Sequence, residues 1–532
     1  MLNSASLLCV GLVAVVVYIA GGYLRDPKHL RRFPAPSVAA FTHFWLAYKI
    51  STGQRFKVVH AAHQKLGHAV RISPDHISFT YPDSVKEIYG HGSPNLKSDF
   101  FEHTGEGNPS MSQTTNKAEH TRKRKALAHV FAAKQITLME PRVLQIVGKL
   151  CRDIHIKSQD QQVSGEDEYS SVDGIFDVRP WLNMFAYDAI SSMFWSKSYG
   201  FLDKGNDRCS SRAESGATKE VHAMDSYHSI STFNGIYASM PAHWYKLAKV
   251  LLAWTHNRKA LQRFAGMARY QVTERLKVIP PVDDLFARLP TEPSPKWPDP
   301  MPLSELITES ATMLDAGNDT TQTSLANCIY RLAKHPEKQK KLHTALVKAI
   351  PEWDSMPAFT YSETLRHIPY LRAVLDESFR VQPPIASGLP RKVVEPITVS
   401  GHYIHPGTTI SVPLYSLHRD ESLFKDANNF IPERFLKDDN PDRDGFITDP
   451  QEVQNLKDYC VPFSVGGRAC IGRNLAYMEL SMVIAALVLG FEWELPDSTH
   501  ELRMIERFNC NPKELKIRAQ PRDGIRWADF KA

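Results

Sequence analysis

The stretch Phe463-Ser-Val-Gly-Gly-Arg-Ala-Cys-Ile-Gly472 places one cysteine among three glycines and an arginine, just before an apolar run from Asn474 to Leu489. The period of that run predicts a helix, so Cys470 would lie at or just before a helix N-terminus. Backbone N–H groups and the helix dipole stabilise negative charge there, which would lower the pKa of the thiol. Glycines would let the backbone turn around the sulfur and let a flat ligand approach closely, and Arg468 could reach an anionic group on that ligand. The alternative is a cysteine that only packs in a core.

The other cysteines do not suggest a second metal or disulfide chemistry. The chain has 7 cysteines, which are scattered, odd in number and without a C-x-x-C pair. Neither a disulfide framework nor a zinc site fits this pattern, and a reducing compartment fits it best. A metal held by a single thiolate remains compatible with it.

Composition is that of a globular protein that does not bind nucleic acid. Of the 532 residues, 42% are hydrophobic and 23% charged, which are ordinary values. The 64 Lys and Arg against 58 Asp and Glu leave a net charge of +6, with no long basic block. This charge is too small to indicate a nucleic-acid partner, although a mildly basic surface can meet an acidic protein or an anionic membrane.

The N-terminal segment predicts a membrane anchor. Residues 1–24 carry no charged side chain, and residues 7–24 are nearly all apolar, long enough to cross a hydrocarbon core of about 30 Å. A cleaved signal peptide is the alternative, but no basic residue precedes the apolar run and Gly21-Gly-Tyr-Leu-Arg25 is a poor cleavage site. Four basic residues follow, so the positive-inside rule places the bulk of the chain on the cytosolic side: Arg25, Lys28, Arg31 and Arg32.

We therefore expect three parts: an N-terminal transmembrane anchor (residues 1–24), a basic, proline-rich hinge (25–36) and one catalytic domain (37–532). Phe33-Pro-Ala-Pro36 would be a stiff, extended piece that holds the body away from its anchor. No later segment is long and apolar enough to suggest a second span, and no internal repeat is visible.

Most of the catalytic domain has helical periodicity. Strands are expected from about residue 55 to 80, around the turn Ser73-Pro-Asp75, and again from Lys392 to Pro413 with turns at Gly401 and Pro406-Gly407. Three polar stretches predict surface loops: residues 158–174, 203–220 and 290–302. The expected fold is mainly α with a minor β region.

Three further motifs lie on predicted helices. Glu377 and Arg380 are three residues apart and share a helix face. Ala316-Gly-Asn-Asp-Thr-Thr321 interrupts a long apolar-periodic segment, residues 304–334, with residue types of low helix propensity, which predicts a local distortion. His120 and Arg124 lie at i and i+4 near a helix start, where they could bind an anionic group.

The cysteine loop resembles the haem-binding loop of the cytochrome P450 superfamily of haem-thiolate monooxygenases, and the other motifs follow in that family's order from about Pro34 to Trp527. The resemblance implies the P450 fold and a haem b whose axial iron ligand is Cys470. A thiolate ligand favours cleavage of the O–O bond. Ser464 stands where many members have a second glycine, and we expect this departure to alter only the turn. The remaining haem-contacting loop residues implied are Phe463, Gly466, Arg468 and Gly472.

The same resemblance assigns roles to the other motifs. Asp319 and Thr320 would relay protons on the oxygen-binding side of the haem. His120, Arg124 and Arg391 would contact its propionates, while Glu377, Arg380 and Arg434 would form a structural cluster behind it. Three neighbouring cations would point elsewhere and form part of a docking surface for an acidic reductase: Arg122, Lys123 and Lys125.

The implied function is a single-pass monooxygenase of the endoplasmic reticulum membrane, with its catalytic domain cytosolic. NADPH-cytochrome P450 reductase would supply electrons, and one atom of O₂ would enter a small hydrophobic substrate by hydroxylation or epoxidation. Residues 121–125, 315–323 and 411–419 look like filamentous-fungal microsomal members, including benzoate para-hydroxylases. We expect a role in secondary-metabolite biosynthesis first and hydroxylation of benzoate-like acids second.

Two other classes of function share the cysteine loop. A haem-thiolate isomerase or dehydratase rearranges a peroxide without a reductase, but such relatives usually lack an acid–alcohol pair like Asp319-Thr320. A haem-based sensor or carrier would bind the group without monooxygenation.

Overall fold

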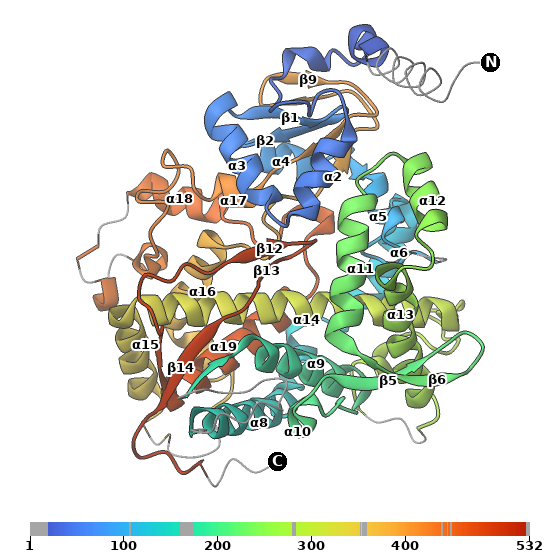
Figure 1. Cartoon of the computed structure of the whole chain (residues 1–532). Helices are drawn as coiled ribbons and strands as arrows, with labels where there is room; N and C mark the ends of the chain where they lie inside the picture. Colours follow the sequence, from blue (N-terminus) through green and yellow to red (C-terminus); the bar gives the residue numbers. More distant parts are fainter. Residues whose placement is uncertain are drawn as a thin grey trace, which may run out of the picture.

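A computed structural model describes residues 20–105, 108–159, 174–278, 283–351, 353, 359–437, 440–443, 445–446 and 449–527. Helices dominate these residues, and the strands form small sheets, which confirms the expected mainly α fold with a minor β region (Figure 1). The helices of the N-terminal half are α2 (His43–Ser51), α3 (Arg55–Leu66), α4 (Ser84–Tyr89), α5 (Asp99–His103), α6 (Lys117–Ala128), α7 (Ala133–Thr137), α8 (Glu140–Gln159), α9 (Arg179–Trp195), α10 (Phe201–Lys204), α11 (Ala223–Tyr237), α12 (Ala242–Leu251) and α13 (His256–Arg275).

The helices of the C-terminal half include the longest one, α14, and the helix that follows the cysteine loop, α19. They are α14 (Leu303–Lys334), α15 (Pro336–Ala349), α16 (Pro369–Val381), α17 (Leu414–Leu417), α18 (Pro450–Tyr459) and α19 (Arg473–Gly490). Short 3-10 turns include η1 (Leu30–Arg32), η4 (Pro432–Phe435) and η6 (Gly466–Arg468).

The largest sheet joins strands from residues 69–97 to strands from residues 391–411. Its strand order is β1-β2-β10-β7-β3, with β10 parallel to β2 and the other pairs antiparallel. Smaller sheets follow the orders β11-β14-β4, β12-β13, β5-β6 and β8-β9. The strands are β1 (Ala69–Ser73), β2 (His76–Phe79), β3 (Leu96–Lys97), β4 (Ile175–Asp177), β5 (Arg208–Arg212), β6 (Thr218–His222), β7 (Arg391–Lys392), β8 (Ile397–Val399), β9 (His402–Ile404), β10 (Thr409–Ser411), β11 (Phe491–Glu494), β12 (Met504–Glu506), β13 (Cys510–Pro512) and β14 (Lys516–Pro521).

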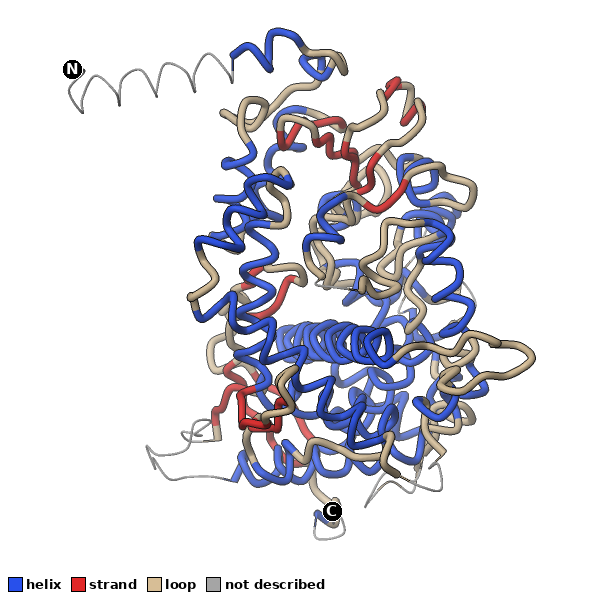
Figure 2. Tube along the Cα trace, turned by 90° about the vertical axis from the view of Figure 1, so that its right-hand side faces the viewer, coloured by secondary structure: helices blue, strands red, loops and turns tan. Residues whose placement is uncertain are grey.

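Helix α14 crosses the middle of the molecule. Figure 1 shows it running across the whole body, and in the turned view of Figure 2 it is seen nearly end-on with other helices around it. Its apolar residues join those of α8, α9 and α19 in the main core, where Leu325, Ile329 and Val483 are fully buried. The distortion predicted around Gly317 does not interrupt this helix, which is continuous from Leu303 to Lys334.

Two expectations about secondary structure are wrong. Residues 55–66 form helix α3 rather than a strand, because Phe56, Val59 and His63 recur at the spacing of one buried helix face. Residues 203–220 are not only a loop: they contain the end of α10 and most of the β5-β6 hairpin, whose strands pair from Arg208↔His222 to Arg212↔Thr218. The strands expected around residues 69–79 and 392–413 are confirmed.

The predicted hinge is docked on the body of the protein. Leu30 and Phe33 are buried in the same apolar cluster as the large sheet, and the Pro34 carbonyl accepts a hydrogen bond from the Arg71 N–H at 2.8 Å. Lys28 Nζ also donates to the Gly407 carbonyl at 2.6 Å. The segment therefore does not act as a free spacer, because its apolar side chains fill a gap at the edge of the sheet.

Most of the predicted anchor, residues 1–19, lies outside the described residues. Among the described residues, α19 is long and apolar enough to cross a membrane, but 83% of it is buried inside the protein. Its apolar character follows from its place in the core, between α8, α14 and α15.

Candidate active site

The cysteine loop connects η6 to α19 and is held by backbone hydrogen bonds. The Cys470 N–H donates to the Phe463 carbonyl at 2.9 Å, which closes the loop on itself. Arg124 Nη1 donates to the Ala469 carbonyl at 2.8 Å and so ties α6 to the residue before the cysteine. The side chain of Cys470 is exposed, and its exposed surface belongs to the wall of an internal cavity.

Protein groups alone do not make Cys470 a thiolate. Burial raises the pKa of the thiol above its ordinary value, and the Gly472 N–H together with Arg124 and Arg473 offsets only part of that rise. The expectation of a pKa lowered by the helix N-terminus is therefore wrong for the chain by itself, because desolvation outweighs the N–H groups. A coordinated metal ion deprotonates a thiol outright, so a metal bound by Cys470 would supply the stabilisation that the protein groups do not.

Two residues of the loop have left-handed backbone conformations. Gly466 has φ +75°, and a Cβ there would lie 2.1 Å from the Tyr89 carbonyl oxygen, so only glycine fits against α4. Ser464 has φ +59°, a region that costs a side chain about 1–2 kcal/mol. The glycine that many family members carry at this position would avoid that strain. Ser464 therefore affects more than the shape of the turn.

Phe463 and Gly472 lie at either end of the loop. The Phe463 ring packs against Phe379 at 5.3 Å and Tyr477 at 5.1 Å between ring centroids, which fixes the loop to α16 and α19. A Cβ at Gly472 would lie 3.9 Å from Cys470 Sγ, an ordinary contact. The protein contacts of this position alone do not require a glycine.

The cavity measures about 960 Å³ and its wall contains both Cys470 and Thr320. Segments 100–105 and 108–113, α11, α13, α14 and the loops around Ile385 and Phe508 also contribute to the wall. Much of this lining is aliphatic or aromatic, which suits a hydrophobic molecule of moderate size. The larger apolar members include Phe100, Phe101, Ile230, Leu261, Phe264, Ile307, Ile385, Leu389 and Phe508.

Cationic side chains gather at one side of this cavity. Arg391, Arg468 and Lys97 line it, and Arg124 is close enough to act electrostatically on His120 and Arg468. Burial first, and then the charges of these four cations, lower the pKa of His120 to about 3. Burial and the neighbouring arginines Arg391 and Arg124 lower the pKa of Arg468 to about 10.

The cluster has unsatisfied donors. Arg391 is 2% exposed, yet its Nη1 and Nη2 atoms have no hydrogen-bond partner, while its guanidinium lies 5.2 Å from the centre of the Tyr89 ring. Buried cations without an anion are costly, so this arrangement fits a ligand that brings negative charge. The propionates of a haem, with its iron at Cys470 in the same wall, meet that requirement.

The structure thus brings the predicted haem-contacting residues together and adds Lys97. The pKa of Lys97 is lowered well below its usual value by burial and by the charges of Arg391 and Arg468. Its Nζ donates to the Ser112 carbonyl. No sequence motif marks this lysine, because its role depends on the pairing of β3 with β7, nearly 300 residues later.

Asp319 and Thr320 face different surroundings. Thr320 lines the cavity and its hydroxyl donates to the Ala316 carbonyl at 2.7 Å, one turn earlier in α14. Asp319 is 1% exposed and accepts hydrogen bonds from Asn509 Nδ2 at 2.8 Å and Asn511 Nδ2 at 2.7 Å. His228 Nε2 lies 3.4 Å from the same carboxylate.

The partners of Asp319 keep it ionised. Burial by itself would raise the pKa of this carboxyl, but the hydrogen bonds from His228, Asn509 and Asn511 outweigh it and the pKa lies below its ordinary value. The sequence did not identify these three partners, since they come from α11 and from the segment around β13, far from α14 in the chain.

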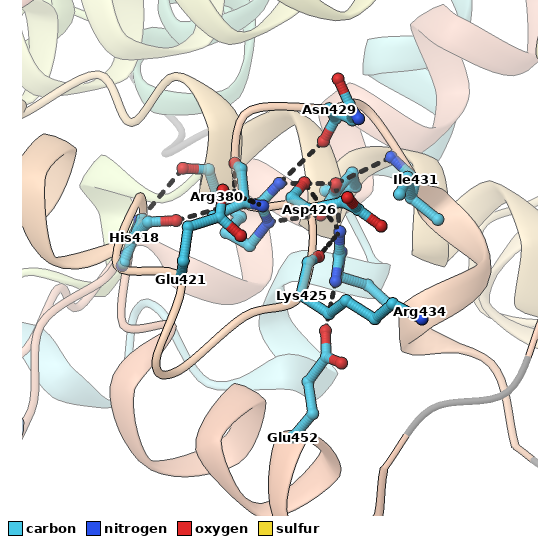
Figure 3. Close-up of polar contacts among 11 residues, drawn as sticks. Arg380, His418, Glu421, Lys425, Asp426, Asn429, Ile431, Arg434 and Glu452 are labelled. Atoms are coloured by element: carbon cyan, nitrogen blue, oxygen red, sulfur yellow. Dashed lines mark hydrogen bonds and ion pairs between the residues drawn. The ribbon is translucent and has the colours of Figure 1, made fainter.

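Glu377, Arg380 and Arg434 form one fully buried network. Figure 3 labels the two arginines and the residues around them. Both Glu377 oxygens pair with Arg380, at 2.7 and 2.8 Å, and Oε1 also accepts from Arg434 Nε at 3.3 Å and from the Ile431 N–H at 2.8 Å. Arg380 donates in addition to the carbonyls of His418, Ala427 and Asn429, as Figure 3 shows in part.

Glu452 completes the network from α18, where it pairs with Arg434 Nη1. The Glu377–Arg380–Arg434 cluster predicted from the sequence is therefore present, and Glu452 was not predicted. Because the cluster joins α16 to the segment from His418 to Arg434, it fixes the protein immediately behind the cysteine loop.

The three cations expected on a docking surface do not all lie there. Lys123 is 2% exposed and pairs with Glu305 at 3.1 Å and Glu309 at 3.2 Å, so it belongs to a buried contact between α6 and α14. Arg122 is partly exposed but also pairs with Glu305, at 2.8 Å. Of the three, Lys125 alone is exposed without an ion pair among the described contacts, with its Nζ 5.9 Å from the Trp297 ring.

Known proteins are similar to this chain over most of its length. The sequence model of the family described as Cytochrome P450 matches residues 34–519. Benzoate 4-monooxygenase bphA of Aspergillus niger is 34% identical over 91% of this chain and 92% of its own length. Tryprostatin B 6-hydroxylase of Aspergillus fumigatus is 26% identical over 90% of this chain and 77% of its own length.

A solved structure shows the same fold. The crystal structure of a cytochrome P450 (CYP102L1) is similar with a TM-score of 0.71 at 18% identity, over 92% of this chain and 99% of the other. At this identity the likeness concerns the arrangement of the helices and sheets.

Proposed function

The chain belongs to the cytochrome P450 family and is an oxidoreductase of its monooxygenase type, and from that premise we propose that it hydroxylates or epoxidises a small hydrophobic substrate in fungal secondary-metabolite biosynthesis. Electrons would come from NADPH through NADPH-cytochrome P450 reductase, and O₂ would be the second substrate. The family implies a haem-iron cofactor.

The observation that carries this proposal is that one cavity wall contains Cys470, Thr320 and a cluster of cations around the buried Arg391 that have no ion pair among the described residues. Cys470 would hold the haem iron, and Arg124, Arg391, Arg468 and His120, with Lys97, would bind its propionates. The bound haem supplies the oxidising chemistry that no protein side chain can provide. Phe463 and Gly466 keep the loop in the conformation that presents Cys470.

The residues of α14 would handle protons and exclude water. The Thr320 hydroxyl lies in the cavity wall with its own proton engaged by the Ala316 carbonyl, so its oxygen is free to accept a hydrogen bond from a water held there. Asp319, held ionised next to it, would accept a proton from solvent and return it through Thr320 or an intervening water. His228 lies beside Asp319 and would carry that proton from α11.

Hydroxylation of benzoate-like acids is the second candidate, and the 34% identity to a benzoate 4-monooxygenase favours it. The presence of both an acid and an alcohol in α14 speaks against an isomerase or dehydratase, which has no need of proton delivery to oxygen. A sensor or carrier without monooxygenation has no need of that pair either.

We also propose that the protein is bound to the endoplasmic reticulum membrane with its catalytic domain in the cytosol. The described residues support membrane contact by the body itself: Phe44 of α2 packs edge-on against Trp244 of α12 at 5.5 Å, and both rings are exposed. Exposed apolar side chains continue along both helices, and such a face suits the interface of a bilayer. We call this set the apolar ridge: Phe41, Phe44, Tyr48, Trp244, Leu247, Val250, Leu251 and Trp254.

The decisive experiment uses the full chain in microsomes with reductase. NADPH-dependent O₂ uptake and one oxygen atom in the product support the proposal, whereas turnover of a hydroperoxide without any electron donor overturns it. A screen of spectral shifts with aromatic acids, polyketides and terpenoids ranks the substrate classes, and a tight low-to-high-spin shift with benzoate would reverse the two candidates. Cys470→Ser abolishes the thiolate absorbance band of the reduced carbon monoxide complex, and its retention would mean another ligand.

A further inference from the structure

An acidic side chain lies in the cavity wall without a cationic partner. Asp315 is on α14, five residues before Thr320, and both line the cavity. No ion pair of Asp315 occurs among the described residues. It is close to Ala316 and Thr312, which also face the cavity, so its position on the helix turns it toward a bound molecule rather than toward solvent.

Two hydroxyl groups of α11 complete this polar spot. Tyr227 is 5% exposed, and it and Ser231 occupy successive turns of α11 in the cavity wall. The Tyr227 hydroxyl is near enough to the Asp315 carboxylate to lower its pKa, and Ser231 acts on the pKa of Tyr227 in the same direction. The carboxylate therefore has hydroxyl groups beside it, and its oxygens remain available to a donor in the cavity.

Burial and the neighbouring Asp319 charge raise the pKa of Asp315 to about 7, while the nearby Tyr227 hydroxyl acts in the opposite direction. The ionised carboxylate gains from a ligand that brings a positive charge or a hydrogen-bond donor. A ligand carboxylate would meet like charge at close range unless Asp315 took up a proton, so it is favoured less.

We propose that Asp315, in the cavity wall beside Tyr227 and Ser231, is the acceptor that recognises a hydrogen-bond donor, an ammonium or a hydroxyl, on an otherwise hydrophobic substrate. This inference rests on the proposed function and adds the substrate class to it. The five-residue spacing in α14 places this acceptor about 7.5 Å along the helix from Thr320. The oxidised carbon of the substrate would lie a comparable distance from the donor, and benzoate-like acids would bind poorly.

The test uses four probes of one shape and the haem-loaded full chain in the ferric state. The probes are 2-naphthalenemethanol, 2-(dimethylaminomethyl)naphthalene, 2-(methoxymethyl)naphthalene and 2-naphthoate. Isothermal titration calorimetry gives dissociation constants at pH 7.5, and absorbance spectra show whether any probe binds the iron directly. The alcohol and the ammonium probe separate a neutral donor from a cation.

We expect the ammonium and the alcohol to bind at least about tenfold more tightly than the ether, and the carboxylate to bind most weakly. In Asp315→Asn the ammonium loses about tenfold in affinity, while the ether changes by less than twofold. Asp523→Asn is the matched control, because it makes the same change at an acid that is exposed and lies outside the cavity wall. It leaves all four constants unchanged.

Equal binding of the ether and the two donors by the wild-type protein would overturn the inference, as would an unchanged preference in Asp315→Asn. Haem content, measured for each variant, shows that it has folded, and the wild-type comparison stands even if one variant does not fold. The binding measurement needs neither reductase nor O₂. A donor preference without NADPH-dependent product would therefore refute the proposed function alone, and product without a donor preference would refute this inference alone.

Discussion

Asp319 and Thr320 are neighbours in α14, yet Thr320 lies in the wall of the cavity that contains Cys470 while Asp319 is buried against Asn509 and Asn511. The acid is thus separated from the substrate and held ionised, and the alcohol faces the substrate. Each residue can therefore be tested by itself.

Thr320→Ala removes the hydroxyl from the cavity wall and leaves the ionised Asp319 in place. We expect NADPH oxidation to continue, product formation to fall on the order of 10- to 100-fold, and hydrogen peroxide to account for the difference, because protons no longer arrive at the right oxygen. Parallel assays of NADPH, product and peroxide measure this. Thr320→Ser restores most of the coupling, and full coupling in Thr320→Ala would exclude the role.

Asp319→Asn replaces an acceptor-only group that receives hydrogen bonds from two asparagine amides. We expect a loss of about 1–3 kcal/mol of unfolding free energy at pH 7, because donors then face a donor. The folded pKa of Asp319 lies below its ordinary value, so its stabilisation is present above the unfolded pKa of about 3.9 and is lost as pH falls through the folded pKa. The difference between wild type and variant should thus shrink below pH 4 in denaturant titrations, whereas Asp523→Asn, on the exposed surface, should show no such difference.

Arg391→Gln should have opposite effects on the protein with and without haem. Without haem it removes a buried charge from a cluster of cations, so we expect a higher melting temperature and a higher pKa for His120. With haem it removes a propionate partner, so transfer of haem to an excess of apomyoglobin should become several-fold faster. A variant that loses stability in both states would mean that Arg391 serves only packing.

Glu377→Gln leaves the buried guanidinium groups of Arg380 and Arg434 with less compensating charge. Breaking a buried pair in this way costs about 3–5 kcal/mol, so we expect little haem-containing protein to accumulate. The absorbance of the reduced carbon monoxide complex per milligram of protein measures it. Glu337→Gln, on the exposed face of α15, should accumulate normally.

Ser464→Gly removes the left-handed strain of a residue with φ +59°. The relief of about 1–2 kcal/mol is partly offset by about 0.5–1 kcal/mol of backbone entropy, so we expect a net gain of about 0.5 kcal/mol. Thermal unfolding followed by circular dichroism, and the rate of haem loss on heating, should both show the gain. An equal or lower stability would mean that contacts of the serine hydroxyl compensate for the strain.

Deletion of residues 1–24 should not by itself release the protein from membranes, because the apolar ridge of α2 and α12 remains. We expect the truncated protein to sediment with vesicles, and the triple change of Trp244, Val250 and Trp254 to Ser to reduce that fraction several-fold. Leu138→Ser, at an exposed apolar position on another face, serves as the control. Complete release of the truncated protein would exclude the ridge as a membrane contact.

Much of the fold and the centre of the site follow from local sequence. The period of residues 304–334 and 474–489 predicts α14 and α19. The glycines around Cys470 predict a loop, and at Gly466 no other residue can adopt its conformation. Helix α3 is not predicted correctly because the alternation of residues 69–79 does not continue back into residues 55–66, where the spacing of the buried residues is helical.

The parts of the site that the sequence did not reveal depend on tertiary contacts. Asn509 and Asn511 bond to a carboxylate 190 and 192 residues away, and Lys97 meets Arg391 only through strand pairing. The sequence reveals the helix N-terminus, which lowers the pKa of Cys470. It does not reveal the extent of the burial, which raises that pKa.

The continuity of α14 has a consequence for how the oxidised position of a substrate can change. Asp315 and Thr320 are on one unbroken helix, so their separation is set by helical rise and not by a loop. An acid moved one turn back, to Ala311 or Thr312, would shift the anchoring point by about 5 Å without disturbing the oxygen-handling residues. The oxidised position of the substrate could then be shifted by one helical turn with two substitutions. One introduces the acid at Ala311 or Thr312, and the other replaces Asp315 by a neutral residue.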